Sequence, residues 1–402
     1  MTNMKKLMIL GAGIYQVPLI KKAKELGLYT IAVSIKGNYP GFAFADEVCY
    51  VDTTDIDAVL ALAKEKQIDG ICTSGTDVAI PAIGKVCDEM GLPGISYQAA
   101  LMASNKSDMK RCFMEHGVST AKYFIAHSEN EAMDFMDQLE FPVIFKAVDT
   151  SGSRGIMRVN EKDVDQVRKA IENIKSVTKK DFFIIEEFIE GVEFGAQALI
   201  AKGELKFVMP HGDYVFVGDT GVPVGHYVPY DLPEDVFKES IRQVKLSAQA
   251  MQLDNCAMNV DFILKEDQVY MLEVGARAGA TCLCEMVEIY YQTDFYKMII
   301  QTALGEELSS INFDHCVPNV CKLFLAEKTG IIEQIEIPKI EDDRIFDLSF
   351  DYQPGDHVKK FRIGPDRIGQ IIVKGKTLEE AVELMEAVMK DVKVTIREQG
   401  EH

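Results

Sequence analysis

Two carboxylates stand among apolar residues in NVDFILKEDQVYMLEVGARAG, residues 259–279. Lys-Glu-Asp-Gln at 265–268 has the composition of a turn, so Asp261 and Glu273 can come level across two antiparallel strands. Acids held together in apolar surroundings repel unless a proton or a divalent cation lies between them. Carboxylate oxygens suit Mg²⁺, which often binds together with substrate phosphates. The pattern predicts a cation site with Arg277 nearby; the alternative is two acids on a solvated sheet face.

Two other stretches carry residue types that suit a phosphorylated ligand. In DTSGSRG (149–155), small residues would let backbone N–H groups approach phosphate oxygens, with Lys146 and Arg154 adding positive charge. The loop lacks the Walker A order and has a strand on each side, so a plain hairpin turn is the alternative. In EEFIEGVEF (186–194), Glu186 and Glu193 bracket a glycine, and the alternative there is a pair of exposed acids beside a turn.

The first hundred residues alternate strand and helix patterns, which predicts a doubly wound parallel sheet. Gly11 and Gly13 occupy the first strand-to-helix turn, but Gln16 stands where a dinucleotide fingerprint needs its third glycine. Ser34 ends the second strand where that fingerprint expects an acid, so an NAD-dependent oxidoreductase is disfavoured. The turn is either purely structural or holds an anionic ligand end. The expected strands are 6–10, 29–34, 47–52 and 68–74, with helices at 15–27, 56–65 and up to residue 90.

From about residue 104 the pattern changes to antiparallel α+β. A glycine-rich stretch at 211–227 reads as a long loop, which in a compact domain is usually functional or mobile. His226 in that stretch either faces a substrate or lies on a surface loop. The other expected elements are helices at 104–117, 234–251 and 377–391 and strands within 121–126, 141–159 and 182–201.

Composition limits the function classes. The chain has 402 residues, 47% hydrophobic, and a net charge of −20, which fits a soluble protein of several domains and disfavours nucleic-acid or anionic-membrane partners. Nine cysteines show no CxxC pair, and Cys282-Leu283-Cys284 does not have zinc-ligand spacing, so a reducing cytoplasm is expected. No apolar run approaches the roughly 20 residues of a membrane span.

The order of these motifs resembles the ATP-grasp superfamily. That order is Lys106, then Lys146 with its glycine-rich loop, then E-E-F-I-x-G-x-E, then Asp261 and Glu273, then E-V-G-A-R. The resemblance covers nearly the whole chain, and residues 367–392 are similar to the closing domain of biotin carboxylase, glycinamide ribonucleotide synthetase and bacterial L-amino acid ligases. It implies an α/β and α+β fold in three parts: a doubly wound pre-ATP-grasp (Rossmann-like) domain over 1–103, a two-lobed ATP-grasp core over 104–309 with a nucleotide-covering lobe at about 118–190, and a small α+β domain over 310–402.

The resemblance also implies roles for the matching residues. Glu186 would meet the adenine amino group, Glu187 and Ile189 would meet the adenine edge through their backbone, and Glu193 would bind the ribose. Phosphate contacts are implied for Lys106, Lys146, Ser151, Gly152, Ser153, Arg154 and Gly155. The metal ligands would be Asp261 and Glu273, the catalytic groups Arg277 and Lys146, and the substrate contacts Gly11, Gly13, His226 and Arg277.

The implied activity is ligation of a small carboxylic acid to an amine, through an acyl phosphate made from ATP with Mg²⁺ or Mn²⁺. A homodimer is one expected assembly. Many members of the superfamily read E-[IV]-N-x-R, whereas this chain has Gly275 in place of the asparagine ligand. The amine ligase is an amino-acid or dipeptide ligase in the first interpretation. The alternatives are a phosphoribosylglycinamide-synthetase-like or carboxylase-type enzyme, and an ATP-binding protein without catalysis.

Overall fold

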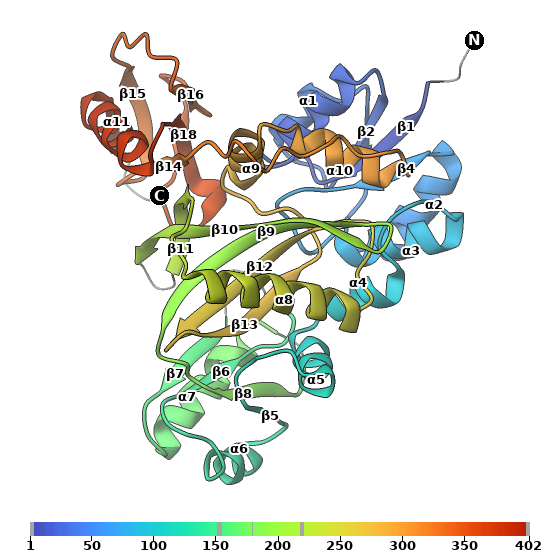
Figure 1. Ribbon diagram of the computed structural model, residues 1–402, viewed down its shortest axis with the longest axis vertical. Coiled ribbons are helices and arrows are strands. Elements are labelled where there is room, and N and C mark those ends of the chain that lie inside the picture. The colour runs from blue at the N-terminus through green and yellow to red at the C-terminus, as the bar shows by residue number, and fades with distance from the viewer. Residues whose placement is uncertain (1–3, 151–154, 179, 218–220, 399–402) are drawn as a thin grey trace.

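The computed structural model describes residues 4–150, 155–178, 180–217 and 221–398. Its first part is a four-stranded parallel sheet in the order β3-β2-β1-β4, which confirms the predicted doubly wound domain. Figure 1 shows this part in blue at one end of the molecule. Its elements are β1 Lys6–Leu10, α1 Val17–Glu25, β2 Tyr29–Ser34, η1 Pro40–Ala43, β3 Glu47–Tyr50, α2 Ile56–Lys66, β4 Gly70–Cys72, α3 Ile80–Met90 and α4 Tyr97–Ala103.

A separate small lobe lies below the central sheet in Figure 1. It is an antiparallel sheet in the order β5-β8-β6-β7, with its own apolar core shared with two helices. Helix α5 leads into it from the first domain, and its N-terminus is capped by the Asn105 side chain, which accepts from the N–H of Ser107. The elements are α5 Lys106–His116, β5 Tyr123–Ala126, α6 Glu129–Met136, β6 Val143–Lys146, β7 Ile156–Val159, α7 Val164–Lys175 and β8 Phe183–Glu187.

The central sheet has eight strands in the order β13-β12-β9-β10-β11-β14-β18-β16. The prediction of a long loop at 211–227 is wrong, because residues 211–217 belong to β10 and residues 221–227 to β11, and the two strands pair antiparallel. The glycines that suggested a loop allow close approach within the sheet: a Cβ at Gly212 would lie 2.0 Å from the Tyr227 ring, and one at Gly225 would lie 2.3 Å from the Cys321 carbonyl. The elements are β9 Val192–Ala201, β10 Glu204–Val217, β11 Gly221–Val228, α8 Glu234–Ala250, β12 Cys256–Lys265 and β13 Gln268–Gly275.

The C-terminal part extends the central sheet and adds a second sheet in the order β17-β15-β19. Strand β14 pairs with β11, so one continuous sheet crosses residue 310, where the sequence predicts a domain boundary. Thr377 caps α11 by accepting from the N–H of Glu380. The elements are α9 Leu283–Tyr291, α10 Phe295–Ala303, β14 Asn319–Leu325, β15 Gly330–Glu336, β16 Ile345–Phe350, β17 His357–Val358, η2 Gly364–Asp366, β18 Arg367–Lys374, α11 Leu378–Asp391 and β19 Lys393–Glu398.

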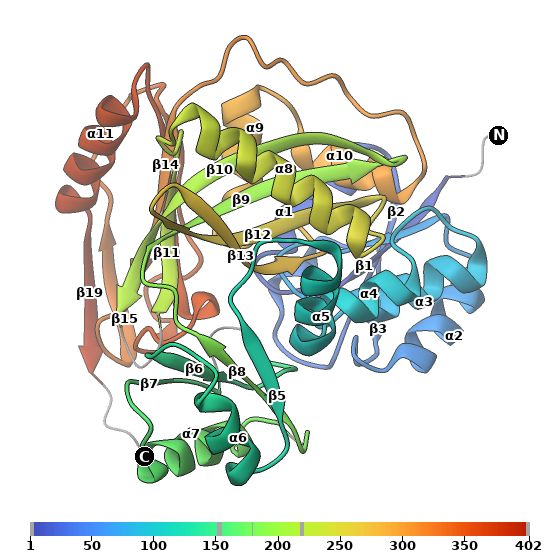
Figure 2. The same ribbon diagram turned by 60° about the horizontal axis from the view of Figure 1, so that its bottom comes forward.

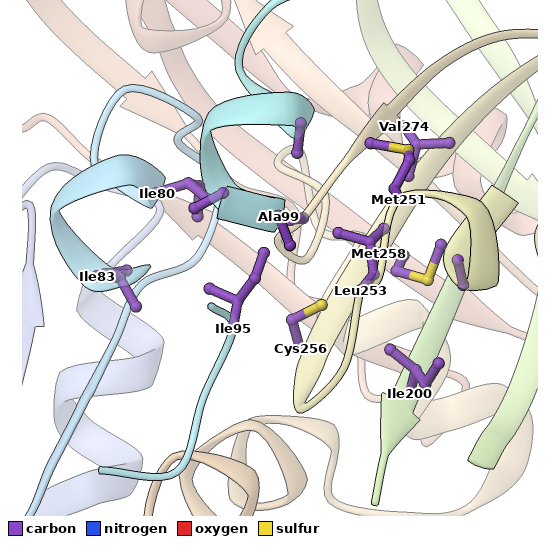
Figure 3. Packing of buried hydrophobic residues seen from close by; sticks show 14 of the residues in the cluster. Ile80, Ile83, Ile95, Ala99, Ile200, Met251, Leu253, Cys256, Met258 and Val274 are labelled. Carbon is purple, nitrogen blue, oxygen red and sulfur yellow. The ribbon is translucent and has the colours of Figure 1, made fainter. Parts of the chain in front are cut away.

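One apolar cluster joins the first domain to the central sheet. Figure 3 shows Ile80 and Ile95 from the first domain pointing toward Cys256 and Met258 of β12. Helix α8 covers the same face of the sheet (Figure 2) and contributes Val244 to the cluster. Because side chains alternate along a strand, the odd-numbered residues of β12 around position 261 lie on the opposite face. The core therefore fixes which face of the sheet is left for polar side chains.

Candidate active site

A row of polar residues crosses four strands of the central sheet on the face away from α8. Glu273 of β13 is the direct partner of Asp261 on β12, which confirms that the two acids come level. Asp261 in turn is level with Gly195 of β9, and Gly195 is level with His211 of β10. A Cβ at Gly195 would lie 2.2 Å from the His211 ring, so the imidazole leans over this glycine. The row brings two carboxylates and an imidazole onto one face.

Asp261 has a neighbourhood that disfavours its negative charge. Its side chain is accessible to solvent, yet the protein that surrounds it raises the pKa of its carboxyl to about 7. The carboxylates of Glu273 and Asp213 add to the rise, and Arg277 opposes it. The donor set is made of hard oxygens whose mutual repulsion a divalent cation would relieve, so the residues present fit Mg²⁺.

Lys106 links helix α5 to this pair of acids. It is the first residue of α5, and its Nζ lies 2.7 Å from Oε1 of Glu273. Its N–H donates to the carbonyl of Val148, which ties the start of α5 to the segment after β6. The N–H of Val274 contacts the Met109 sulfur at 3.4 Å, so α5 packs directly on β13. Lys106 thus brings a positive charge to one of the two predicted metal ligands.

A second charged cluster lies in the lobe below the sheet. Glu186 of β8 is 2% exposed, and its two carboxylate oxygens contact the ammonium groups of Lys110 and Lys146. Burial alone would raise the pKa of Glu186, but the two lysines lower it to about 2. The Nζ of Lys110 also donates to Oγ1 of Thr120 at 2.6 Å. Two ammonium groups thus neutralise the carboxylate of Glu186, whereas the carboxylate of Asp261 has other carboxylates as neighbours.

Arg277 lies behind the acid pair and is held by the first domain. Its Nε and Nη2 donate to Oδ1 and Oδ2 of Asp77, both at 2.8 Å. Burial alone would lower the pKa of Arg277, but Asp77, Asp261 and Glu273 raise it. The guanidinium is therefore a permanent cation within electrostatic reach of both predicted metal ligands.

Two histidines share one carboxylate oxygen at the edge of the row. Nδ1 of His211 and Nδ1 of His226 lie 2.9 Å and 2.6 Å from Oδ1 of Asp213, and both imidazoles are buried. Burial alone would raise the pKa of Asp213, but the imidazoles lower it, and burial lowers the pKa of His226. The three side chains could hold a metal ion, since their ligand atoms lie within 4.8 Å of one another. His226 is not on a surface loop.

The other residues that the sequence assigns to the nucleotide lie near β7, β8 and β9 or outside the described residues. Ser151, Gly152, Ser153 and Arg154 lie outside the described residues, while Gly155, next to them, has φ +68° and joins Ala147 by a backbone hydrogen bond of 2.9 Å. Glu187 and Ile189 are half-buried at the end of β8, and Glu193 is exposed at the start of β9.

The glycine turn of the first domain has protein partners for both of its predicted binding groups. The N–H of Gly11 donates to the Val33 carbonyl at 2.8 Å, and that of Gly13 to Oε1 of Gln16 at 2.9 Å. Gln16 is 5% exposed and fills the turn where a dinucleotide fingerprint has its third glycine. The described turn therefore holds a protein side chain where one of the two interpretations placed an anionic ligand end.

Sequence reasoning missed several residues of the site. Lys110 lies four residues after Lys106 and so on the same face of α5, a spacing that could have identified it. His211 and Asp213 are two residues apart on β10 and so share one face of the sheet. The loop interpretation hid this spacing. Gln197 donates from Nε2 to Oδ1 of Asn259 at 2.6 Å and accepts from the N–H of Gly279, contacts that have no local sequence signal.

Two family models match the chain, one for the ATP-grasp domain over residues 139–285 and one for the L-amino acid ligase C-terminal domain 2 over residues 322–397. The crystal structure of phosphoribosylglycinamide synthetase from Anaerococcus prevotii is similar, with 37% identity, a TM-score of 0.87, and coverage of 98% of this chain and 100% of that chain. The biotin carboxylase domain of 2-oxoglutarate carboxylase from Hydrogenobacter thermophilus, solved with MgADP, has 19% identity and a TM-score of 0.82, and covers 98% of this chain and 91% of that chain.

Formate-dependent phosphoribosylglycinamide formyltransferase from Methanocaldococcus jannaschii is 24% identical over 97% of each chain. The fold and these similarities thus place the chain among the ATP-dependent ligases. The chain belongs to the ATP-grasp superfamily. It is an ATP-binding enzyme of the ADP-forming ligases that make C–N bonds. Within the residues that the structure describes, no helix is long and apolar enough to cross a membrane.

Proposed function

We propose that this protein activates the carboxylate of an amino acid or dipeptide as an acyl phosphate, with ATP and Mg²⁺, and joins it to the amino group of a second amino acid. The observation that carries the proposal is the pairing of Asp261 with Glu273, with Lys106 on one side and Arg277 behind. Phosphoryl transfer needs positioning and charge neutralisation more than an acid–base pair, and this set supplies both.

In this proposal ATP lies between the small lobe and the central sheet. Lys106 and Lys146 contact its phosphates, together with the segment 151–155. Glu186 accepts from the adenine amino group, and Glu193 binds the ribose. The N–H of Glu187 already donates to the Lys122 carbonyl, so its own carbonyl is the group that would meet the adenine, next to the N–H of Ile189.

Asp261 and Glu273 would hold the Mg²⁺, which supplies charge neutralisation at the phosphates when bound. Mn²⁺ also binds carboxylate and water oxygens and is the alternative metal ion. The row beyond the metal ligands, with His211 and His226, is assigned to the substrates. Nine free cysteines, eight of them buried, fit the expected reducing cytoplasm. A homodimer stays an open expectation.

The reaction then has two displacements. A substrate carboxylate oxygen attacks the γ-phosphorus, the bond to ADP breaks, and an acyl phosphate forms. The amine attacks the acyl carbon, the C–O bond to phosphate breaks, and the amine loses a proton. Arg277 keeps its charge throughout and steadies the oxygens that become negative in each step.

The charge pattern favours an amino acid over a phosphorylated sugar as the amine. Arg277 is matched by Asp77, and Arg367, which lies over the Tyr15 ring beside the glycine turn, is matched by Asp351. With Asp213 added, this region suits an ammonium group and repels a second phosphate. The match of residues 322–397 to the L-amino acid ligase C-terminal domain supports the same substrate class.

A second candidate rests on the 37% identity to the protein titled phosphoribosylglycinamide synthetase. This candidate would join glycine to phosphoribosylamine by the same two displacements. A carboxylase-type reaction is a further alternative within the superfamily. Binding of ATP without catalysis is the alternative of another class, because the chain has Gly275 where the superfamily resemblance implies a metal-binding asparagine.

The test is phosphate release from Mg-ATP with acids and amines offered singly and in pairs. The panel contains the amino acids, dipeptides, the glycine and phosphoribosylamine pair, and bicarbonate, with mass spectrometry of each product. Release that needs one amino acid and a second amine establishes the proposal. Phosphate release only with glycine and phosphoribosylamine would support the synthetase alternative instead. Release only with bicarbonate would support the carboxylase alternative. If no substrate causes phosphate release while ATP raises the melting temperature, the protein binds ATP without catalysis on these substrates.

A further inference from the structure

The segment that follows β4 in the first domain docks against the loop between β13 and α9. The N–H of Gly75 donates to the carbonyl of Ala278 at 3.1 Å. Two residues further along, Asp77 makes its two hydrogen bonds to Arg277. This contact brings a carboxylate from the pre-ATP-grasp domain to the predicted catalytic arginine of the core.

The carboxylate of Asp77 occupies the space next to Gly275. A Cβ built on Gly275 would lie 2.9 Å from Oδ1 of Asp77, closer than ordinary packing allows. Gly275 is absent from the glycines with positive φ in the described chain, so its backbone conformation is open to any residue. What requires glycine at this position is therefore room for Asp77.

The geometry of the pair leaves part of the guanidinium free for a ligand. Asp77 takes one N–H of Nε and one of Nη2, and Nη1 donates to the Ala278 carbonyl at 3.3 Å. A guanidinium has five N–H donors, so one on Nη1 and one on Nη2 remain. A two-point contact fixes the plane of the guanidinium, and the remaining donors then have a fixed direction. Asp77 thus orients Arg277 without consuming it.

We propose that Asp77 is a positioning residue of the ligase reaction, which holds Arg277 in the orientation that its chemistry needs, and that position 275 is glycine to admit the Asp77 carboxylate. The part of this proposal that concerns catalysis rests on the function proposed above. The proposal makes the first domain a contributor to the reaction rather than a scaffold. It also gives the missing side chain at Gly275 a structural cause.

A double-mutant cycle on turnover tests the steric and electrostatic parts together. Asp77→Asn keeps the shape and weakens the ion pair; we expect it to lower kcat about 10- to 100-fold, the usual loss when a supporting partner of a site is removed. The KM for ATP should change less than kcat, since the two side-chain hydrogen bonds of Asp77 go to Arg277. Gly275→Ala should cause a similar loss in the wild-type chain but less than about a threefold change in the Asp77→Ala chain, where the clash is absent. Equal losses in both backgrounds overturn the proposal.

A chemical measurement decides the positioning even if turnover is absent. Phenylglyoxal modifies accessible arginines, and peptide mass spectrometry can follow Arg277 alone in the full-length protein. We expect Arg277 to react faster in Asp77→Asn and in Gly275→Ala than in the wild type. Asp57→Asn, which removes an exposed carboxylate of the same domain, is the matched control and should change neither rate nor turnover. An unchanged Arg277 rate in both variants, at an unchanged melting temperature, overturns the proposal whatever the fate of the proposed reaction.

Discussion

Glu186 and Asp261 are two carboxylates of one candidate site with opposite electrostatic surroundings. Burial alone would raise the pKa of each, but Lys110 and Lys146 lower that of Glu186 to about 2. Glu273 and Asp213 instead help to raise that of Asp261 to about 7. The difference separates a cluster in which lysines stabilise the carboxylate from one in which neighbouring carboxylates repel each other, the cluster where we propose that the metal ion binds. A charged site can thus be divided, before any ligand is seen, into a matched half, here Glu186 with Lys110 and Lys146, and an unmatched half, here Asp261, Glu273 and Asp213.

Removing an acid from the unmatched half should have the largest effect on activity. Asp261→Asn and Glu273→Ala are each expected to lower turnover by about 1,000-fold or more, because several kcal/mol of charge stabilisation depend on the metal. Phosphate release at saturating Mg-ATP measures this. Glu266→Gln, an exposed acid in the turn of the same hairpin, is the control and should keep wild-type turnover. Wild-type turnover in either of the first two variants would remove the metal site from the account.

Lys146→Ala tests whether Lys146, which contacts Glu186 in the matched half, also binds the ATP phosphates. It is expected to abolish turnover while the protein stays folded, since the side chain is assigned to the ATP phosphates and its loss leaves Lys110 to balance Glu186. Turnover and circular dichroism together measure the two parts of this expectation. An active Lys146→Ala variant would contradict the phosphate assignment.

Removing the acid from the matched half should instead damage stability. Glu186→Gln leaves the buried ammonium of Lys110 and the partly buried one of Lys146 without their carboxylate, and breaking a buried ion pair in this way costs about 3–5 kcal/mol. Urea unfolding measures the loss, with Glu190→Gln, an exposed neighbour, as the control. A loss no larger than that of the control would show that the cluster is not balanced as described.

The two acids should also give opposite pH dependence. The pKa of Glu186 is lower in the folded state than its ordinary 4.5, so its contribution to stability is present above that pH and is lost as pH falls toward 2. The pKa of Asp261 is higher in the folded state, so the folded protein keeps a proton that the unfolded chain releases, and stability falls as pH rises from about 4 to about 7.

Unfolding in EDTA across this pH range measures both trends. Asp261→Asn should remove the fall between pH 4 and 7, and saturating Mg²⁺ should reduce it in the wild type. Glu186→Gln should flatten the acid side only. The same slope for all three proteins would contradict the assignment of the two pKa shifts.

The smallest effect is expected outside both halves. Lys238 and Glu234 form an exposed pair one turn apart on α8. Lys238→Ala should lower the free energy of unfolding by about 0.5 kcal/mol or less and leave turnover unchanged. A larger change in the free energy of unfolding or in turnover would show that surface charges contribute as much as the two clusters do.

The parts of the fold set by local patterns could be predicted from the sequence. The turn at 265–268 fixes the hairpin register, so the meeting of Asp261 with Glu273 could be expected before the structure. The alternating elements of the first hundred residues likewise fix its parallel sheet. The β10–β11 hairpin could not, because glycines that serve close approach between strands have the same composition as glycines of a loop.

The contacts between distant segments were beyond local patterns. Asp77 and Arg277 lie 200 residues apart, and nothing near Asp77 indicates its partner. The sequence alone shows only a glycine at position 275, where the superfamily resemblance implies an asparagine. The structure shows that another residue fills the space, a fact that depends on how two domains dock.

The most direct test of the central claim follows an oxygen atom. Once the panel gives a productive pair, the acid is prepared with ¹⁸O in its carboxylate and turned over with unlabelled Mg-ATP. If the carboxylate attacks the γ-phosphorus and phosphate later leaves from the acyl carbon, each released phosphate carries one ¹⁸O. Unlabelled phosphate accompanied by formation of the amide would contradict the acyl phosphate and with it the proposed reaction.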